Sequence, residues 1–169
     1  LNPLVNLIRV PKKPIILMDE WESKIKAIVE NTWNKDVNSL SGVPSWMLVL
    51  IKAVLKKTGR EYLTDVWPNL EVFFHGGISF EPYREQYKTL IPSNKMHYME
   101  TYNASEGFFG LQDDPTDSSL LMMPDYGIFY EFIPMNEVGN AHPTVLPLES
   151  VETGKNYAMV ITTSGGLWR

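Results

Sequence analysis

Three side chains with different chemistry occur within the short segment 102–107 of the sequence. Tyr102 offers an aromatic face, Ser105 a hydroxyl group and Glu106 a carboxylate. These groups could serve a purine ring, a phosphate oxygen and a divalent cation. The same residue types are also typical of a polar turn with a solvated glutamate, and such turns are common on protein surfaces.

The residues before this segment favour a β-strand. Bulky and polar residues alternate from 96 to 102, and β-forming residues are frequent there. Small and polar residues then predict a loop from Asn103 to Gly107. Open α/β sheets bind ligands in loops at the carboxyl ends of their strands, so this loop is a candidate ligand site.

A second candidate loop, His75-Gly76-Gly77, follows an apolar strand predicted at 70–74. Two glycines directly after a strand allow the backbone to approach a ligand closely, although a plain strand-to-helix turn has the same composition. His75 has no second histidine near it in the sequence, which is typical of a structural residue and not of a base.

The remaining pattern predicts an α/β fold with a mostly parallel sheet, flanking helices and an antiparallel strand pair toward the C-terminus. Asp19 is the predicted cap of a first helix that ends near Asn31, and Ser79 is the predicted cap of a later helix that Pro92 closes. The predicted elements are helices at 19–31, 42–59, 61–66 and 79–92, strands at 70–74, 96–102 and 156–163, paired strands at 120–123 and 126–133, and a hairpin from Ser164 to Arg169; residues 1–17 and 34–41 show no clear element.

Composition limits the classes of function. The chain has 169 residues, no cysteine, three histidines and a net charge of −5. The charge argues against a general nucleic-acid or anionic-membrane binder, and the lack of cysteine excludes a disulfide framework and a thiolate metal site. No targeting or membrane-spanning segment is recognisable, so the default location is the cytoplasm. Thr162–Gly166 resembles a phosphate loop but lacks its Gly-Lys-Ser/Thr ending.

Five strings together resemble one known family. Tyr102–Gly107 is similar to the Tyr-x-x-Ser/Thr-Glu motif of adenylate-forming enzymes, and Phe73–Ile78 is similar to their adenine-contacting Gly-Gly/Ala segment. Gly42–Trp46, Tyr130–Pro134 and Val160–Arg169 narrow the resemblance to the GH3 family of acyl-acid amido synthetases. Asn103 departs from the Gly that many adenylating enzymes carry there, although small polar residues also fit a tight turn.

The resemblance implies that ATP and a carboxylic acid form an acyl-adenylate, and that an amine such as an amino acid then takes the acyl group. By resemblance, Gly76, Gly77 and Ile78 line the adenine, and Tyr102, with Asn103 and Ala104, lies against it. Ser105 meets the α-phosphate and Glu106 binds Mg²⁺. The resemblance also implies, more loosely, that Val43, Trp46 and Phe108 line the acyl pocket.

The same resemblance implies that residues 1–169 are the central part of an adenylation domain, truncated at both ends. We therefore expect the phosphate loop before Leu1 and a ribose-binding segment after Arg169. We also expect the isolated chain to be inactive, to bind ATP weakly or not at all, and to self-associate through its truncated edges. Two alternatives are a ligase of the same superfamily that forms acyl-coenzyme A and a non-catalytic binding or scaffold domain.

Overall fold

The computed structural model describes residues 3–164 and divides the chain into two compact units. The first unit comprises the described residues up to Thr101 together with Asp113–Ser118. The second comprises Tyr102–Gln112 together with the residues from Ser119 onward. No helix among the described residues has the length and apolar content needed to cross a membrane.

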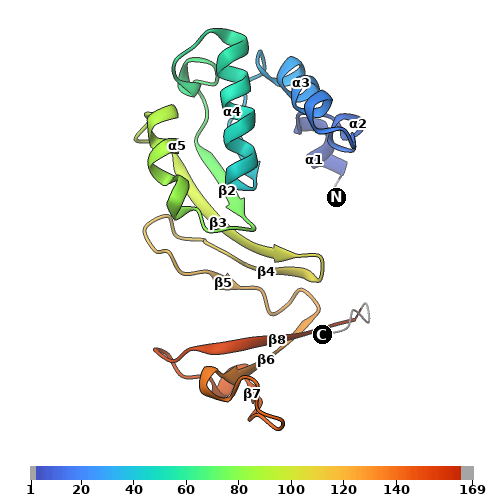
Figure 1. Cartoon of the computed structure of the whole chain (residues 1–169), viewed down its shortest axis with the longest axis vertical. Helices are drawn as coiled ribbons and strands as arrows, with labels where there is room; N and C mark the ends of the chain where they lie inside the picture. Colours follow the sequence, from blue (N-terminus) through green and yellow to red (C-terminus); the bar gives the residue numbers. More distant parts are fainter. Residues whose placement is uncertain (1–2, 165–169) are drawn as a thin grey trace. The chain divides into compact units, whose positions relative to one another are not determined.

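Helices dominate the first half of the chain (Figure 1). The longest is α4, and its ends follow from the sequence: Pro44 occupies the first turn, where a missing N–H costs nothing, and Gly59 ends the helix with a left-handed φ of 65°. The helices are α1 (Pro3–Ile8), α2 (Lys13–Ile16), α3 (Trp21–Thr32), α4 (Pro44–Thr58) and α5 (Arg84–Leu90), with 3₁₀ turns η1 (Leu63–Asp65) and η2 (Glu81–Tyr83).

Five strands follow one another in the order β1-β2-β3-β4-β5. Their bounds are β1 (Ser39–Gly42), β2 (Val72–Gly76), β3 (His97–Ala104), β4 (Gly107–Leu111) and β5 (Leu121–Met122). β1, β2 and β3 are parallel, whereas β4 and β5 are antiparallel. Together with the second sheet described below, this arrangement confirms the predicted α/β class and the predicted adjacency of the strands near 70–75 and 96–102.

The first unit has a deep apolar core in which α4 and α5 both pack against β2. Phe73 of β2 is fully buried, and so are Ile51 of α4 and Tyr87 of α5. The buried members of this core are Val29, Val37, Leu40, Leu48, Ile51, Val54, Leu55, Leu63, Trp67, Leu70, Phe73, Phe80, Tyr87, Ile91 and Met96.

The second unit contains a separate antiparallel sheet of three strands, ordered β7-β6-β8. The strands are β6 (Ile128–Pro134), β7 (Leu146–Pro147) and β8 (Tyr157–Thr163), with 3₁₀ turns η3 (Met135–Glu137) and η4 (Leu148–Ser150). Ile128 and Tyr130 bury one face of β6 with Phe109, while Phe129, which points to the other face, is 61% exposed. Figure 1 shows β6, β7 and β8 together at the orange-to-red end of the chain.

Several element predictions were wrong in detail. β5 pairs with β4, and β6 pairs with β7 and β8, so the strands predicted at 120–123 and 126–133 do not pair with each other. Residues 1–17 contain two short helices, and 34–41 contains most of β1. Glu20, not Asp19, caps α3, and Ser79 is not a cap. The predicted hairpin beyond Ser164 lies outside the described residues.

Candidate nucleotide and acyl-acid site

The carboxyl ends of β1 and β2 lie at one edge of the sheet in the first unit. Gly42 is in register with His75, and Gly76 is in register with Thr101 of β3. Because the three strands are parallel, the segments that follow β1 and β2 leave the sheet at the same edge. This edge therefore carries Val43, which follows β1, and Gly77, which follows β2.

β2 extends through Gly76, so His75 and Gly76 lie in the strand and not in the predicted loop. Gly76 and Gly77 are required to be glycine for different reasons. A Cβ atom on Gly76 would overlap the carbonyl oxygen of Thr101 and lie 2.9 Å from its Oγ1, so close strand pairing by itself requires a glycine there. Gly77 has open space except for Cγ2 of Val43, which would lie 3.5 Å from a Cβ atom, but its φ of 82° favours glycine. Ile78, the next residue, is exposed.

Val43 and Trp46 have different surroundings although they are three residues apart. Val43 lies against Gly77 at the sheet edge, whereas the Trp46 ring is 62% exposed and lies 5.9 Å from the Trp21 ring of α3, centroid to centroid. Met47, which sequence reasoning did not single out, reaches this edge: its Cε would be 3.3 Å from a Cβ atom on Gly42. Neighbouring residues of a helix point in different directions, and this was the signal in the sequence that Met47 and Trp46 have different surroundings.

Beneath this edge lies a cluster of rings that we call the aromatic stack: Phe73, His75, Phe80, Tyr87 and Tyr98. The His75 ring is 4.2 Å from the Phe80 ring and nearly parallel to it. His75 is only 3% exposed, and burial, with a smaller contribution from the Arg84 charge, lowers its pKa to about 4. A neutral, buried His75 fits the structural role predicted for it.

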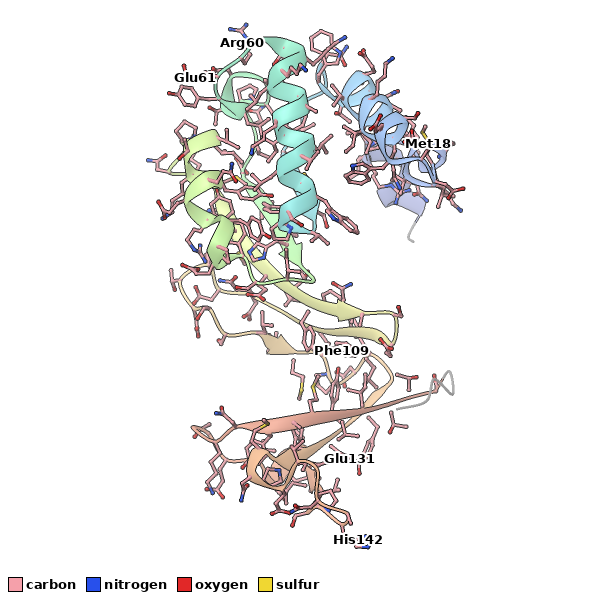
Figure 2. The ribbon with its side chains drawn as sticks, viewed as in Figure 1. Met18, Arg60, Glu61, Phe109, Glu131 and His142 are labelled. Atoms are coloured by element: carbon pink, nitrogen blue, oxygen red, sulfur yellow. The ribbon has the colours of Figure 1, made fainter. Side chains whose placement is uncertain are left out.

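In the second unit, β3 continues through Ala104, so Asn103 and Ala104 lie in the strand and not in the predicted loop. Ser105 and Glu106 form the two-residue turn between β3 and β4, and both are exposed. The Tyr102 ring is 49% exposed and lies 5.0 Å from the ring of Phe109, which Figure 2 labels on β4. Tyr102 is thus supported from one side and accessible to a ligand.

The predicted site residues are divided between the two units. Val43, Trp46 and Gly76–Ile78 belong to the first unit, while Tyr102–Glu106 and Phe108 belong to the second. Phe108 is partly buried, and its ring lies 6.0 Å from that of Tyr126. Thr101, which pairs with Gly76 in the first unit, directly precedes Tyr102 in the chain.

The residues present fit a magnesium–nucleotide complex better than a metal held by the protein alone. Between residues 3 and 164, no three His, Asp or Glu side chains gather closely enough to form a metal site. Mg²⁺ is commonly held by one or two carboxylates together with substrate phosphates. The exposed carboxylate of Glu106, in the same turn as Ser105, is one oxygen donor of the kind that such a complex uses.

Comparison with known families finds two matches. Residues 2–96 match the GH3 family N-terminal domain, and residues 121–169 match the GH3 family central domain.

Curated relatives share moderate identity with the chain. It is 29% identical over 160 residues to the indole-3-acetic acid-amido synthetase GH3.4 of Arabidopsis thaliana, covering 88% of this chain and 25% of that protein. It is 36% identical over 118 residues to the indole-3-acetic acid-amido synthetase GH3.8 of Oryza sativa subsp. indica, covering 63% of this chain and 19% of that protein. The chain thus spans a quarter or less of the length of these two relatives.

Two solved structures share the fold. The GH3.15 acyl acid amido synthetase superposes with a TM-score of 0.69 at 16% identity, covering 92% of this chain and 37% of that one. A long-chain-fatty-acid-CoA ligase (FadD1) from Archaeoglobus fulgidus superposes with a TM-score of 0.50 at 15% identity, covering 82% of this chain and 27% of that one. At these identities the likeness concerns the fold alone.

Proposed function

The chain belongs to the GH3 family, and from that membership we propose that the protein containing it is an ATP-dependent acid–amine ligase. In this proposal a carboxylic acid reacts with ATP to give an acyl-adenylate and pyrophosphate, and an amine such as an amino acid then displaces AMP from the acyl group. Residues 1–169 form the central part of its adenylation domain. Because the chain spans a quarter or less of its curated relatives, the activity is proposed for the complete protein, and the isolated chain is expected to be inactive.

One observation supports this proposal most strongly: β2 and β3 are parallel neighbours with Gly76 opposite Thr101. This pairing puts Thr101, the residue that directly precedes the Tyr102–Glu106 motif in the chain, beside Gly76 in the first unit. In the proposal, Gly76, Gly77 and Ile78 present backbone and a small apolar surface to the adenine ring. Tyr102, with its ring half exposed, stacks on that ring, and the adjacent backbone of Asn103 and Ala104 continues the surface.

The turn between β3 and β4 supplies the polar groups of the proposed site. The Ser105 hydroxyl donates a hydrogen bond to an α-phosphate oxygen, and the Glu106 carboxylate binds Mg²⁺. When bound, Mg²⁺ offsets the negative charge that develops as pyrophosphate departs. In the adenylation step neither residue needs to move a proton, because the attacking group is an already ionised carboxylate; the amine loses its proton only in the later transfer step.

We propose that the acyl acid lies near Val43, and Phe108 stays a looser candidate from the resemblance alone. Val43 follows β1 at the same edge as Gly77, and its apolar side chain suits the hydrocarbon part of an acid. We propose that Trp46 lies at the periphery of the acyl pocket and not in its lining, because its ring packs beside that of Trp21.

ATP–pyrophosphate exchange by the complete protein, measured with a panel of carboxylic acids, tests the proposal. The panel includes indole-3-acetic acid, benzoic acid and a long-chain fatty acid. We expect exchange that depends on at least one acid and requires Mg²⁺. The absence of acid-dependent exchange with every member would favour the non-catalytic binding module.

A second assay distinguishes the acceptors. Acid-dependent AMP release is measured with a mixture of amino acids or with coenzyme A. We expect amino acids to accelerate release, as the names of the curated relatives suggest. Acceleration by coenzyme A alone would support the ligase alternative, for which the likeness to the fatty-acid ligase provides only a shared fold.

A further inference from the structure

A single buried hydroxyl group links α5 to the first turn of α4. The Tyr87 side chain is fully buried, and its hydroxyl donates a hydrogen bond of 2.8 Å to the carbonyl oxygen of Pro44. Pro44 begins α4 and directly follows Val43. In a regular helix that carbonyl also accepts the N–H of Leu48, so the Tyr87 hydroxyl is a second, external donor to it.

The Tyr87 ring has little freedom to move. It stacks on Phe73 at 5.1 Å with an angle of 19° between the rings, contacts Phe80 at 5.2 Å and meets Tyr98 edge-on at 6.0 Å. Burial raises the pKa of Tyr87 well above its ordinary range, so the hydroxyl remains a donor at neutral pH. A fixed ring with a protonated hydroxyl places the hydrogen-bond donor at a defined position.

The hydrogen bond between Tyr87 and Pro44 joins the helix that follows the proposed adenine segment to the helix that follows the proposed acyl-acid residue Val43. α5 follows the Gly76–Ile78 segment through η2, and Pro44 follows the residue that lies against Gly77. Movement of the first turn of α4 would therefore shift Val43 relative to Gly77. The Gly76 backbone is fixed separately by its pairing with Thr101, and that pairing does not involve the Tyr87 hydroxyl.

We propose that Tyr87 is a positioning residue for the acyl acid: its hydroxyl fixes the first turn of α4 and so holds Val43 in place beside Gly77. The proposal rests on the function proposed above and adds a residue that contacts neither substrate. It assigns the hydroxyl group to acid binding and not to ATP binding, because the backbone on the adenine side is fixed by β2–β3 pairing.

The test compares Tyr87→Phe with Tyr98→Phe in the complete protein. Both variants remove one buried hydroxyl from the aromatic stack and keep the ring. The Tyr98 hydroxyl finds no hydrogen-bond partner among the described residues, so its removal is a matched control. The measurements are KM for acid and for ATP in pyrophosphate exchange, acid binding by calorimetry without ATP, and the midpoint of thermal unfolding.

A neutral hydrogen bond contributes a free energy that corresponds to about a twofold to tenfold change in an equilibrium constant. We expect Tyr87→Phe to weaken acid binding and raise its KM by about that factor, with the KM for ATP unchanged. Tyr98→Phe should leave both KM values unchanged.

Three results would overturn the inference: an unchanged acid KM in Tyr87→Phe, an equal rise in both KM values accompanied by a lower unfolding midpoint, or the same acid effect in Tyr98→Phe. Failure of the proposed function itself would be seen separately, as the absence of acid-dependent exchange in the unsubstituted protein.

Discussion

The two units of the chain bury their apolar side chains to very different extents. Among the described residues, the first unit gathers fifteen buried hydrophobic side chains in one core, whereas the core of the second contains three. In the second unit Phe129 is exposed on one face of β6 while Tyr130 is buried on the other. Burial of apolar surface is the main source of stability, so the first unit should be the more stable of the two.

This difference bears on how the candidate site is built. Gly76 ends β2, and Gly77 and Val43 directly follow β2 and β1, which lie on the deep core, so the backbone geometry of these residues depends on packing. Ser105 and Glu106 lie in an exposed turn of the second unit. Their side chains therefore contribute little to stability, and in the proposal they act through their hydroxyl and carboxylate groups. Substitutions in the two places should therefore separate effects on stability from effects on activity.

The largest expected effect is that of Phe73→Ala in the first unit. Truncating a fully buried phenylalanine costs about 3–5 kcal/mol, so amide hydrogen exchange in peptides from β2 and α5 should become much faster. Peptides from β6 and β8 should change little. Mass spectrometry of the complete protein measures this, with Phe129→Ala as the control at an exposed ring. Equally faster amide exchange in both units would show that the units unfold together, and would contradict the proposed difference in their stability.

Glu106→Gln should affect activity without affecting stability. Loss of a metal-binding carboxylate should lower ATP–pyrophosphate exchange on the order of 10²-fold, because the amide is a poorer ligand for Mg²⁺. The unfolding midpoint should stay unchanged, since the side chain is exposed. Glu152→Gln, which removes an exposed carboxylate paired with Lys155, is the control within the same unit. Exchange that is unaffected across Mg²⁺ concentrations would contradict the metal role.

Adjacent glycines of the first unit should differ in sensitivity. Gly76→Ala places a methyl group against the Thr101 backbone and should cost about 1–3 kcal/mol. Gly77→Ala meets only ordinary contact distances but must keep a φ of 82°, which costs about 1–2 kcal/mol. Hydrogen exchange in β3 peptides distinguishes them, because only the first substitution should disturb the β2–β3 pairing. A larger effect in β3 from Gly77→Ala would mean that the close approach to Thr101 is not what requires glycine at 76.

Tyr102→Ala should raise the KM for ATP. Base–aromatic stacking is worth about 1–3 kcal/mol, which corresponds to a rise of roughly 5- to 150-fold. The KM for the acid should change less. Phe129→Ala, at a ring of similar exposure in the same unit, serves as the control in this kinetic assay as well. An unchanged KM for ATP would exclude Tyr102 from the adenine site.

The smallest expected effect concerns the cap of α3. The hydroxyl and N–H of Ser23, and the N–H of Glu22, hold the pKa of Glu20 below its ordinary value. A carboxyl whose pKa is lowered by folding stabilises the folded state above its unfolded pKa, and that contribution is lost as the pH falls through its folded pKa. Glu20→Gln should therefore reduce the acid sensitivity of the unfolding midpoint slightly. An unchanged pH profile would mean that α3 does not depend on the ionised cap.

The sequence predicted elements best where local pattern and tertiary packing agree. The long apolar run of α4 with its proline start and glycine end, and the apolar strand β2, were placed within a few residues. β1 was missed because Ser39–Gly42 has weak strand preference and becomes a strand through pairing with β2. α2 was missed because a helix of four residues is too short to show a helical apolar pattern, although its proline is favourable in a first turn.

The candidate site shows a similar limit. The residue types and spacing of Gly76, Gly77, Tyr102 and Glu106 predict both motifs, and the roles of these residues stay predictions. The sequence did not show that β3 extends to Ala104, because the end of that strand depends on pairing with β4. Nor did it show that Trp46 faces Trp21, because the orientation of a helix about its axis is set by packing against other elements.

If the proposed adenine site is correct, the close approach of Gly76 to Thr101 also limits how the nucleotide preference of the complete protein can be engineered. Every side chain at 76 collides with the neighbouring backbone, so a saturation library at that position would report only on folding. Ile78 is 40% exposed and follows the same strand two residues later. A library that varies position 78 and keeps 76 constant is therefore the better starting point for selecting variants that accept GTP or modified purines.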